Sequence, residues 1–169
     1  MRSLSLFAAS TIAGLVAAAP AMAGVDITFV NPRGFTDAGL YRVGRVDENA
    51  PALTGLRRIF ERSGRGLPPG QDLKIEVLDV DLAGFFPPWR GTRPPIRVME
   101  PTTWPRITLR YTLTQNGRVI GSDDAVLTDM TYLRRPAVAR STDPLRFEEP
   151  MIADWFAVRF GVTRRPAAR

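Results

Sequence analysis

The chain has 169 residues, of which 44% are hydrophobic and 24% charged, a composition typical of a globular domain. It contains no histidine and no cysteine, which excludes disulfide bonds, a thiol nucleophile, a lipid-modified cysteine and the side chain that most often acts as a general base. The net charge of +6 does not predict nucleic-acid binding, because four of the 23 basic residues lie outside residues 24–161 and the other 19 are interleaved there with all 17 acidic residues.

The first 23 residues have the organisation of a cleaved signal peptide. Arg2 supplies a positive start, an apolar run extends from Leu4 to Ala19, and Ala21-Met22-Ala23 is a small-residue cleavage site. The run is short and interrupted, and no later segment approaches the ~20 apolar residues that a membrane span needs. We therefore expect a periplasmic mature chain that begins at Gly24 and has no transmembrane segment.

The mature chain is long enough for one domain, expected over residues 24–161, followed by a basic flexible tail at 162–169. Alternating side chains at 25–30 predict a first strand that ends at the Asn-Pro pair beyond it, since proline cannot donate to a sheet ladder. Residues 51–63 place apolar side chains at helical spacing between an initial proline and a terminal glycine, which predicts an amphipathic helix.

A second strand begins near Gly70, and its alternation changes part of the way along. Up to Val77 the odd-numbered positions are apolar, whereas beyond it the even-numbered positions are apolar and Asp79 and Asp81 alternate with them. One extra residue near Val77–Leu78, a β-bulge, restores a single buried face. Both aspartates would then share the open face, either as solvated charges that prevent edge pairing or as a pair close enough to bind a cation.

A proline-rich loop follows from Phe85 to Pro95, where four prolines exclude a helix or a central strand. Its aromatic residues Phe85, Phe86 and Trp89 have two interpretations. They cap the open end of the core, or they form an exposed surface for a partner. Residues 96–99 are predicted to form a short edge strand.

The strongest local pattern is a β-hairpin. Residues 106–114 and 119–127 alternate between polar and apolar side chains. Between them lies Asn116-Gly117, the pair preferred in a two-residue type I′ turn. We therefore expect these strands to be antiparallel neighbours.

The register of this hairpin leaves one question open. If Gln115 faces Arg118, simple counting places Arg110 opposite Asp123. It also places Asp124 on the apolar face. Either a second bulge near the glycine at position 121 intervenes, or Asp124 is held in a less solvated position.

The last predicted element is a helix over residues 150–160, which begins at a proline and ends before a glycine. Its apolar side chains recur at helical spacing and form a buried stripe, which consists of Ile152, Trp155, Phe156 and Phe160. The order of strand, helix, strands and helix predicts an α+β fold. We expect an antiparallel sheet of four or five strands with the helices 51–63 and 150–160 packed on one face.

Carboxylates are the remaining candidates for catalysis, because no nucleophile-elbow serine, phosphate-binding loop or dinucleotide motif is present. The candidates are Asp79, Asp81, Asp123, Asp124 and Asp129, with Glu148 and Glu149 as additional members. Such groups suit Ca²⁺ or Mg²⁺, or an acid/base pair, but their spacing selects neither.

Two main hypotheses follow for the function. The leading one is a non-catalytic periplasmic protein, without a cofactor or a bound metal, that contacts an envelope protein or a small ligand through Asp79, Asp81, Asp129, Phe85, Phe86 and Trp89. The alternative is a carboxylate- or divalent-cation-dependent hydrolase that uses Asp79, Asp81 and Asp129. A purely structural or stress-related envelope protein is a third possibility.

Several segments together resemble a proteobacterial family of exported proteins, domain of unknown function 3016; they read VDITFVNPRGFTD, LPPGQDLKIEVLDVDLAG, PRITLRYTLTQNGRVI, LTDMTYL and FEEPMIADWF. The resemblance runs from Val25 to about Phe160. It implies an exported single domain and no particular reaction, since the family has no established activity. The family's recurring positions would fall on Asn31, Pro32, Gly70, Asp79, Asp81, Leu82, Ala83, Gly84, Asp129, Met130, Glu148 and Trp155.

Overall fold

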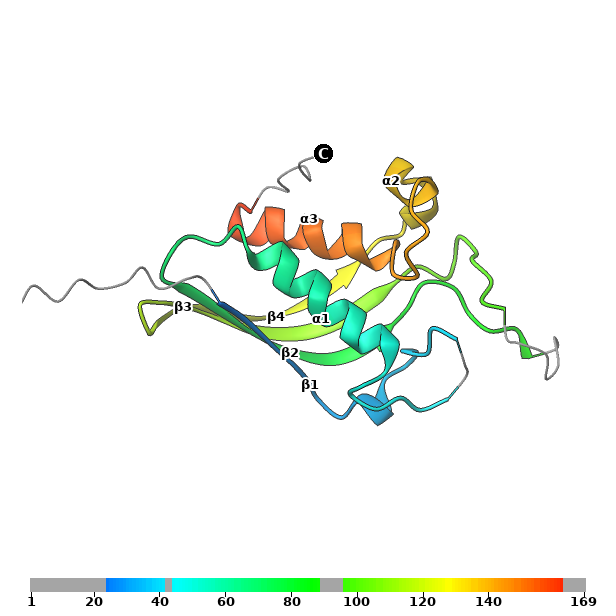
Figure 1. Ribbon diagram of the computed structural model, residues 1–169, viewed down its shortest axis with the longest axis horizontal. Helices are drawn as coiled ribbons and strands as arrows, with labels where there is room; N and C mark the ends of the chain where they lie inside the picture. The colour runs from blue at the N-terminus through cyan, green and yellow to red at the C-terminus, as the bar shows by residue number, and fades with distance from the viewer. Residues whose placement is uncertain (1–23, 42–43, 89–95, 163–169) are drawn as a thin grey trace, which may run out of the picture.

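The computed structural model describes residues 24–41, 44–88 and 96–162. A four-stranded sheet forms one layer, and the two long helices cover one of its faces (Figure 1). The strands lie in the order β1 (Gly24–Phe29), β2 (Gln71–Asp81), β3 (Arg106–Gln115) and β4 (Arg118–Thr128). The helices are η1 (Pro32–Gly34), α1 (Pro51–Gly64), η3 (Tyr132–Arg134), α2 (Pro136–Ala139) and α3 (Glu148–Phe160). The predicted α+β fold is confirmed.

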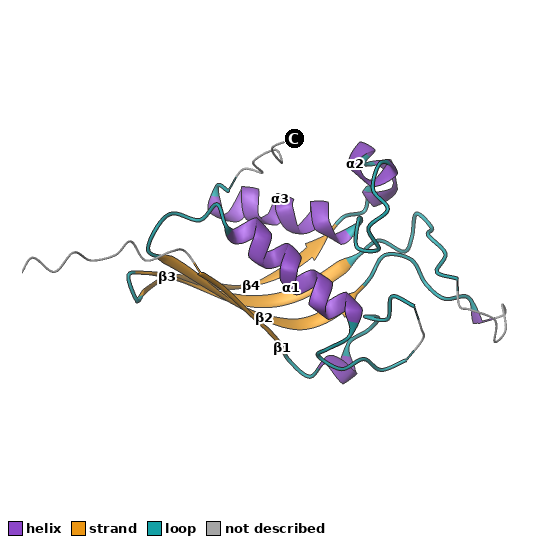
Figure 2. Ribbon diagram, viewed as in Figure 1, coloured by secondary structure: helices purple, strands orange, loops and turns teal. Residues whose placement is uncertain are grey.

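The sheet is mixed, which corrects one detail of the prediction. β2, β3 and β4 are antiparallel neighbours, but β1 runs parallel to β2, from Gly24 opposite Asp72 to Phe29 opposite Val77 (Figure 2). The reason is the connection: the 14-residue helix α1 crosses over between β1 and β2 and allows the chain to enter the sheet in the same direction twice.

The predicted bulge in β2 is present. Val77 pairs with Leu109 and Asp79 with Thr108, so Leu78 is the additional residue on the bulged strand. Val80 is consequently fully buried against the helices, and the side chains on either side of it point to the opposite face.

The hairpin between β3 and β4 turns as predicted at Asn116 and Gly117, which have φ angles of 50° and 79°. A second register shift lies opposite Leu113–Thr114, so the bulge expected near position 121 is present as well. It makes Arg110 face Asp124, and the expected pairing of Arg110 with Asp123 is wrong. Arg110 Nε donates to Asp124 Oδ1 at 2.8 Å on the open face.

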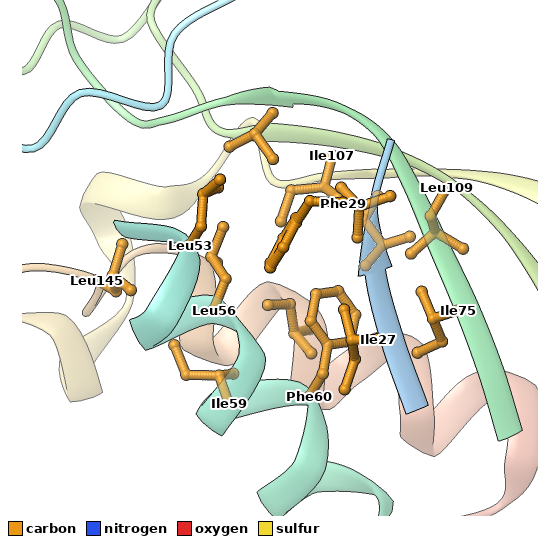
Figure 3. Close-up of a cluster of buried hydrophobic side chains, with 14 of the residues drawn as sticks. Ile27, Phe29, Leu53, Leu56, Ile59, Phe60, Ile75, Ile107, Leu109 and Leu145 are labelled. Carbon is orange, nitrogen blue, oxygen red and sulfur yellow. The ribbon is translucent and has the colours of Figure 1, made fainter. Parts of the chain in front are cut away.

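The core lies between the sheet and the two long helices. Apolar side chains of α1 form one buried cluster with apolar residues of β1, β2 and β3 (Figure 3). The cluster includes Leu53, Leu56, Ile59, Phe60, Ile27, Phe29, Ile75, Ile107 and Leu109. Phe60 is fully buried, and removing such a side chain from water stabilises the fold by roughly 1.5–3 kcal/mol. It also contacts α3, where Phe156 lies 6.4 Å away between ring centroids.

The stripe predicted on the last helix is confirmed, since Ile152 and Phe156 are fully buried and Trp155 and Phe160 pack against the core. α3 begins at Glu148, two residues before the expected start. Pro150 is tolerated there because the first backbone N–H groups of a helix have no intrahelical partner.

Other predictions have a more limited outcome. The segment 96–99 forms no strand, and its sheet-like contact is an isolated bridge between Val98 and Phe85. The proposed signal peptide, Trp89 and nearly all of the basic tail lie outside the described residues. Among the helices that are described, none has the length and apolar character of a membrane span.

Candidate functional site at the carboxyl end of β2

The carboxyl end of β2 brings together carboxylates from two separate segments. Asp79 and Asp81 lie on the open face of the strand, and Asp37, from the loop after β1, forms a backbone bridge with Asp81. The backbone N–H of Asp37 donates to Val80 O, and the N–H of Leu82 donates to Asp37 O, both at 2.9 Å. The parallel arrangement of β1 and β2 creates this meeting, because both strands end at the same edge of the sheet.

Asp79 is fully engaged in holding that loop. Its carboxylate accepts hydrogen bonds from Thr36 N at 2.7 Å, from Thr36 Oγ1 at 2.8 Å and from Val80 N at 2.9 Å. The bulge at Leu78 makes this possible, because it turns Asp79 toward the segment that leaves β1. Asp79 therefore has a clear structural role at this edge.

Asp81 is different, because its carboxylate accepts no hydrogen bond from any described residue. It is half-buried, and its pKa is raised by this burial and by the negative charges of Asp37 and Asp79. Arg106, opposite it on β3, and Arg97 act in the other direction and lower that pKa. Asp81 is thus an incompletely solvated acceptor without a hydrogen-bond donor among the residues that the structure describes.

Asp129 does not join these two aspartates and belongs to a different network. It is 5% exposed and accepts hydrogen bonds from Thr131 N and Thr131 Oγ1. It also pairs with Arg135, whose guanidinium reaches Asp154 on α3 at 2.7 Å. Arg135, at the start of α2, therefore joins Asp129 to α3.

Within residues 24–41, 44–88 and 96–162, no group of three or more acidic side chains is arranged to hold a metal ion. The sequence suggested a cluster of Asp79, Asp81 and Asp129, but only the first two lie together at the end of β2. Asp129 lies with Thr131 and Arg135 instead. Asp123 and Asp124 are exposed on β4. At the end of β2, Asp37 and Asp79 already accept hydrogen bonds from the protein, whereas Asp81 accepts none from the described residues.

Arg97 organises this end of the sheet, and sequence reasoning missed it. Its side chain is 9% exposed, and Nη1 donates to Ala83 O and Gly84 O at 3.0 Å each. Nη2 donates to Asp37 Oδ2 at 2.8 Å and to Gly39 O at 2.6 Å. No sequence signal marked Arg97, because most of its acceptors are backbone carbonyls of distant segments.

Glu148 supports the same turn from the side of the helices. It is 2% exposed, and Oε1 accepts a hydrogen bond from Ala83 N at 2.9 Å. Burial raises its pKa to about 7, although the Ala83 N–H and the charges of Arg97 and Arg146 favour the ionised form. The family resemblance had marked Glu148, but nothing in its spacing indicated that it is buried.

Phe85 and Phe86, in the described part of the following loop, are half-buried. Phe85 pairs through its backbone with Val98, with N···O distances of 2.9 and 2.8 Å, and the guanidinium of Arg97 lies 4.5 Å from the centroid of the Phe86 ring. Gly84 has φ 80°, and a Cβ there would approach Val98 O to 2.5 Å. Backbone bonds to Val98 and the Arg97 guanidinium therefore hold the two phenylalanines at the turn that follows β2.

Two hollows occur elsewhere on the described surface. The larger, about 440 Å³, is a groove on the open sheet face at the start of β1, lined by Gly24, Val25, Asp26, Asp72, Leu73, Lys74, Thr112 and Thr114. The smaller, about 240 Å³, lies between α2 and α3, beside Arg135 and Asp154. Asp81 lines neither of them.

Comparison with known proteins identifies the family of this chain but indicates no activity. No curated protein matches the sequence. Among solved structures, the crystal structure of protein XCC0632 from Xanthomonas campestris, family DUF330, is similar at 17% identity over 86% of each chain, with a TM-score of 0.39. The model of a protein family of unknown function, DUF3016, matches residues 23–158. The chain therefore belongs to the DUF3016 family.

Proposed function

We propose that this protein is an exported, non-catalytic binding domain whose contact surface is the carboxyl end of β2 around Asp81 and Phe86. The observation that carries the proposal is that the carboxylates at this end of the sheet differ in whether they accept hydrogen bonds from the protein. Asp37, Asp79 and Glu148 each hold a partner of the protein itself, whereas Asp81 accepts no hydrogen bond from the described residues.

The chemistry of this surface suits a partner that carries a hydrogen-bond donor or a positive charge. Pairing a half-buried carboxylate with a donor on a partner molecule is favourable, because part of the carboxylate's desolvation cost is already present in the free protein. Phe86 adds a half-exposed aromatic surface next to the turn. Arg97 keeps both features in place, so that a partner would meet a preformed surface.

Export is a separate part of the proposal and rests on the sequence of residues 1–23. Fractionation of cells that make the full chain should place the protein in the periplasm. Its intact mass should correspond to a chain that begins at Gly24. A protein found in the cytoplasm at full length would overturn this part.

Site-specific photocrosslinking tests the contact surface. A photoreactive phenylalanine analogue replaces Phe86 in one strain and Val158, which is 88% exposed on α3, in a control strain. We expect a discrete envelope adduct or ligand adduct from position 86 only, and a strong reduction when Asp81→Asn is added. Equal labelling from both positions, or labelling at position 86 that Asp81→Asn does not change, would contradict the proposal.

A further inference from the structure

The first described residue of the sheet is also the residue that the predicted cleavage would make the N terminus. Gly24 begins β1 and lies opposite Asp72 of β2. Its backbone nitrogen is 3.1 Å from Asp72 Oδ1 and donates a hydrogen bond to it. The candidate cleavage site, Ala21-Met22-Ala23, directly precedes this nitrogen in the sequence.

We propose that Asp72 is the binding site for the α-ammonium group of the mature chain, so that removal of the leader replaces a hydrogen bond from an uncharged amide with an ion pair. The inference rests on the proposed export and cleavage after Ala23. In the uncleaved chain, the nitrogen of Gly24 is an amide with one proton and no charge. After hydrolysis of that peptide bond the same nitrogen is an ammonium group with three protons at neutral pH.

The surroundings of Gly24 favour this pair. Asp72 Oδ1 has Gly24 as its hydrogen-bond partner, and the Asp72 side chain takes part in no ion pair with the other described residues. The groove that adjoins Gly24 contains a second carboxylate, Asp26. The cation that lines it, Lys74, pairs with Glu76 at 3.2 Å.

Space and backbone geometry are also suitable. A Cβ on residue 24 would meet Asp72 Oδ1 at 3.0 Å, so glycine allows the carboxylate to approach the nitrogen closely. The groove of about 440 Å³ leaves room for the additional protons of the ammonium group and their water. The pair would fasten the first residue of β1, which has β2 as its single neighbour among the described strands.

The test compares four forms of the protein that begin at residue 24. A fusion that is cleaved immediately before Gly24 yields the free amine, and the same protein is acetylated at Gly24; each form is made with Asp72 and with Asp72→Asn. Urea unfolding at pH 7 and low salt gives the equilibrium constant of each. We expect acetylation to lower the folding equilibrium constant by up to about fivefold in the protein with Asp72. In the Asp72→Asn protein, which retains an acceptor oxygen but no charge, acetylation should have little effect.

Two controls make the result specific. With Asp26→Asn, which removes the other carboxylate of the groove, the effect of acetylation should persist. In 1 M NaCl it should shrink, because an exposed ion pair is screened. An acetylation effect of the same size in Asp72 and Asp72→Asn proteins would overturn the inference.

This outcome is distinguishable from a failure of the export proposal. The ion pair is measured in recombinant protein whose N terminus is set by the fusion, independently of any signal peptidase. If the cellular protein is not cleaved after Ala23 but the coupling with Asp72 is present, the export proposal fails, whereas the ability of Asp72 to pair with an amine at residue 24 is shown. If cleavage after Ala23 occurs but the acetylation effect does not depend on Asp72, the export proposal stands and the inference about Asp72 fails.

Discussion

Glu148 on α3 accepts a hydrogen bond from the backbone N–H of Ala83, 65 residues earlier in the chain, at 2.9 Å. Its other carboxylate oxygen, Oε2, is buried without a hydrogen-bond partner among the described residues. The contact joins the helical layer to the turn after β2, where Arg97 binds the carbonyl oxygens of Ala83 and Gly84. Glu148 and Arg97 thus hold the turn next to Asp81 from two sides.

The first prediction concerns the pH dependence of stability at Glu148. Burial raises its pKa from 4.5 to about 7 in the folded protein, so the folded state binds the proton more tightly than the unfolded state. The stabilisation from the protonated group is complete below pH 4.5 and is lost as the pH rises through about 7. The full shift corresponds to at most ~3 kcal/mol.

Glu148→Gln keeps an acceptor for Ala83 N–H but has no charge at any pH. We expect its free energy of unfolding to be ~1–3 kcal/mol higher than that of the wild type at pH 8, so that the variant is the more stable protein there. At pH 5 the two free energies of unfolding should be nearly equal. Chemical unfolding at both pH values measures this. Glu61→Gln, on the exposed face of α1, should show no such trend, and a constant difference for Glu148→Gln would contradict the assignment.

The second prediction concerns Arg97. A lysine at this position cannot reach the carbonyl oxygens of Ala83 and Gly39 and the carboxylate of Asp37 at the same time, because it lacks the planar fork of donors. Arg97→Lys should lower the free energy of unfolding by ~2–4 kcal/mol. The matched Arg118→Lys, exposed beside the hairpin turn, should change it little. Equal effects of the two variants in urea unfolding would show that the Arg97 network is not stabilising.

The third prediction separates the two neighbouring aspartates. Asp79→Asn loses charge-assisted hydrogen bonds from Thr36 and should destabilise the protein by ~1–2 kcal/mol at pH 7. Asp81→Asn removes a carboxylate whose pKa is raised by burial and by Asp37 and Asp79, and should leave stability unchanged or increase it. Thermal unfolding of both variants gives the comparison. A larger loss for Asp81→Asn would mean that its carboxylate has a structural partner.

The fourth prediction compares two glycines with almost the same φ angle. Gly84 and Gly117 have φ angles of 80° and 79°, but a Cβ would meet Val98 O at 2.5 Å in the first case and nothing within 4 Å in the second. Gly117→Ala should therefore cost ~1 kcal/mol from backbone strain alone. Gly84→Ala should cost clearly more, as measured by denaturant unfolding, and similar losses would show that the turn at Gly84 can shift to accept a side chain.

Much of the fold was predictable from local patterns. The hairpin follows from strict alternation around Asn116-Gly117, a pair that tolerates positive φ at both turn positions. The bulge at Leu78 follows from a change of phase that a period of two cannot absorb in any other way. The long helices follow from apolar spacing and from their terminal proline and glycine residues.

The sequence by itself thus determined the four strands, the two long helices, the bulge that turns Asp79 and Asp81 to the open face of the sheet, and the family. Only the tertiary structure decided that β1 runs parallel to β2, that Asp129 lies in a separate network, and that Arg97 and Glu148 hold the turn beside Asp81. The physical reason is the range of the interactions. Alternation and turn preferences act between near neighbours, whereas Arg97 and Asp37 meet across 60 residues, and backbone carbonyl acceptors leave no trace in the side-chain sequence.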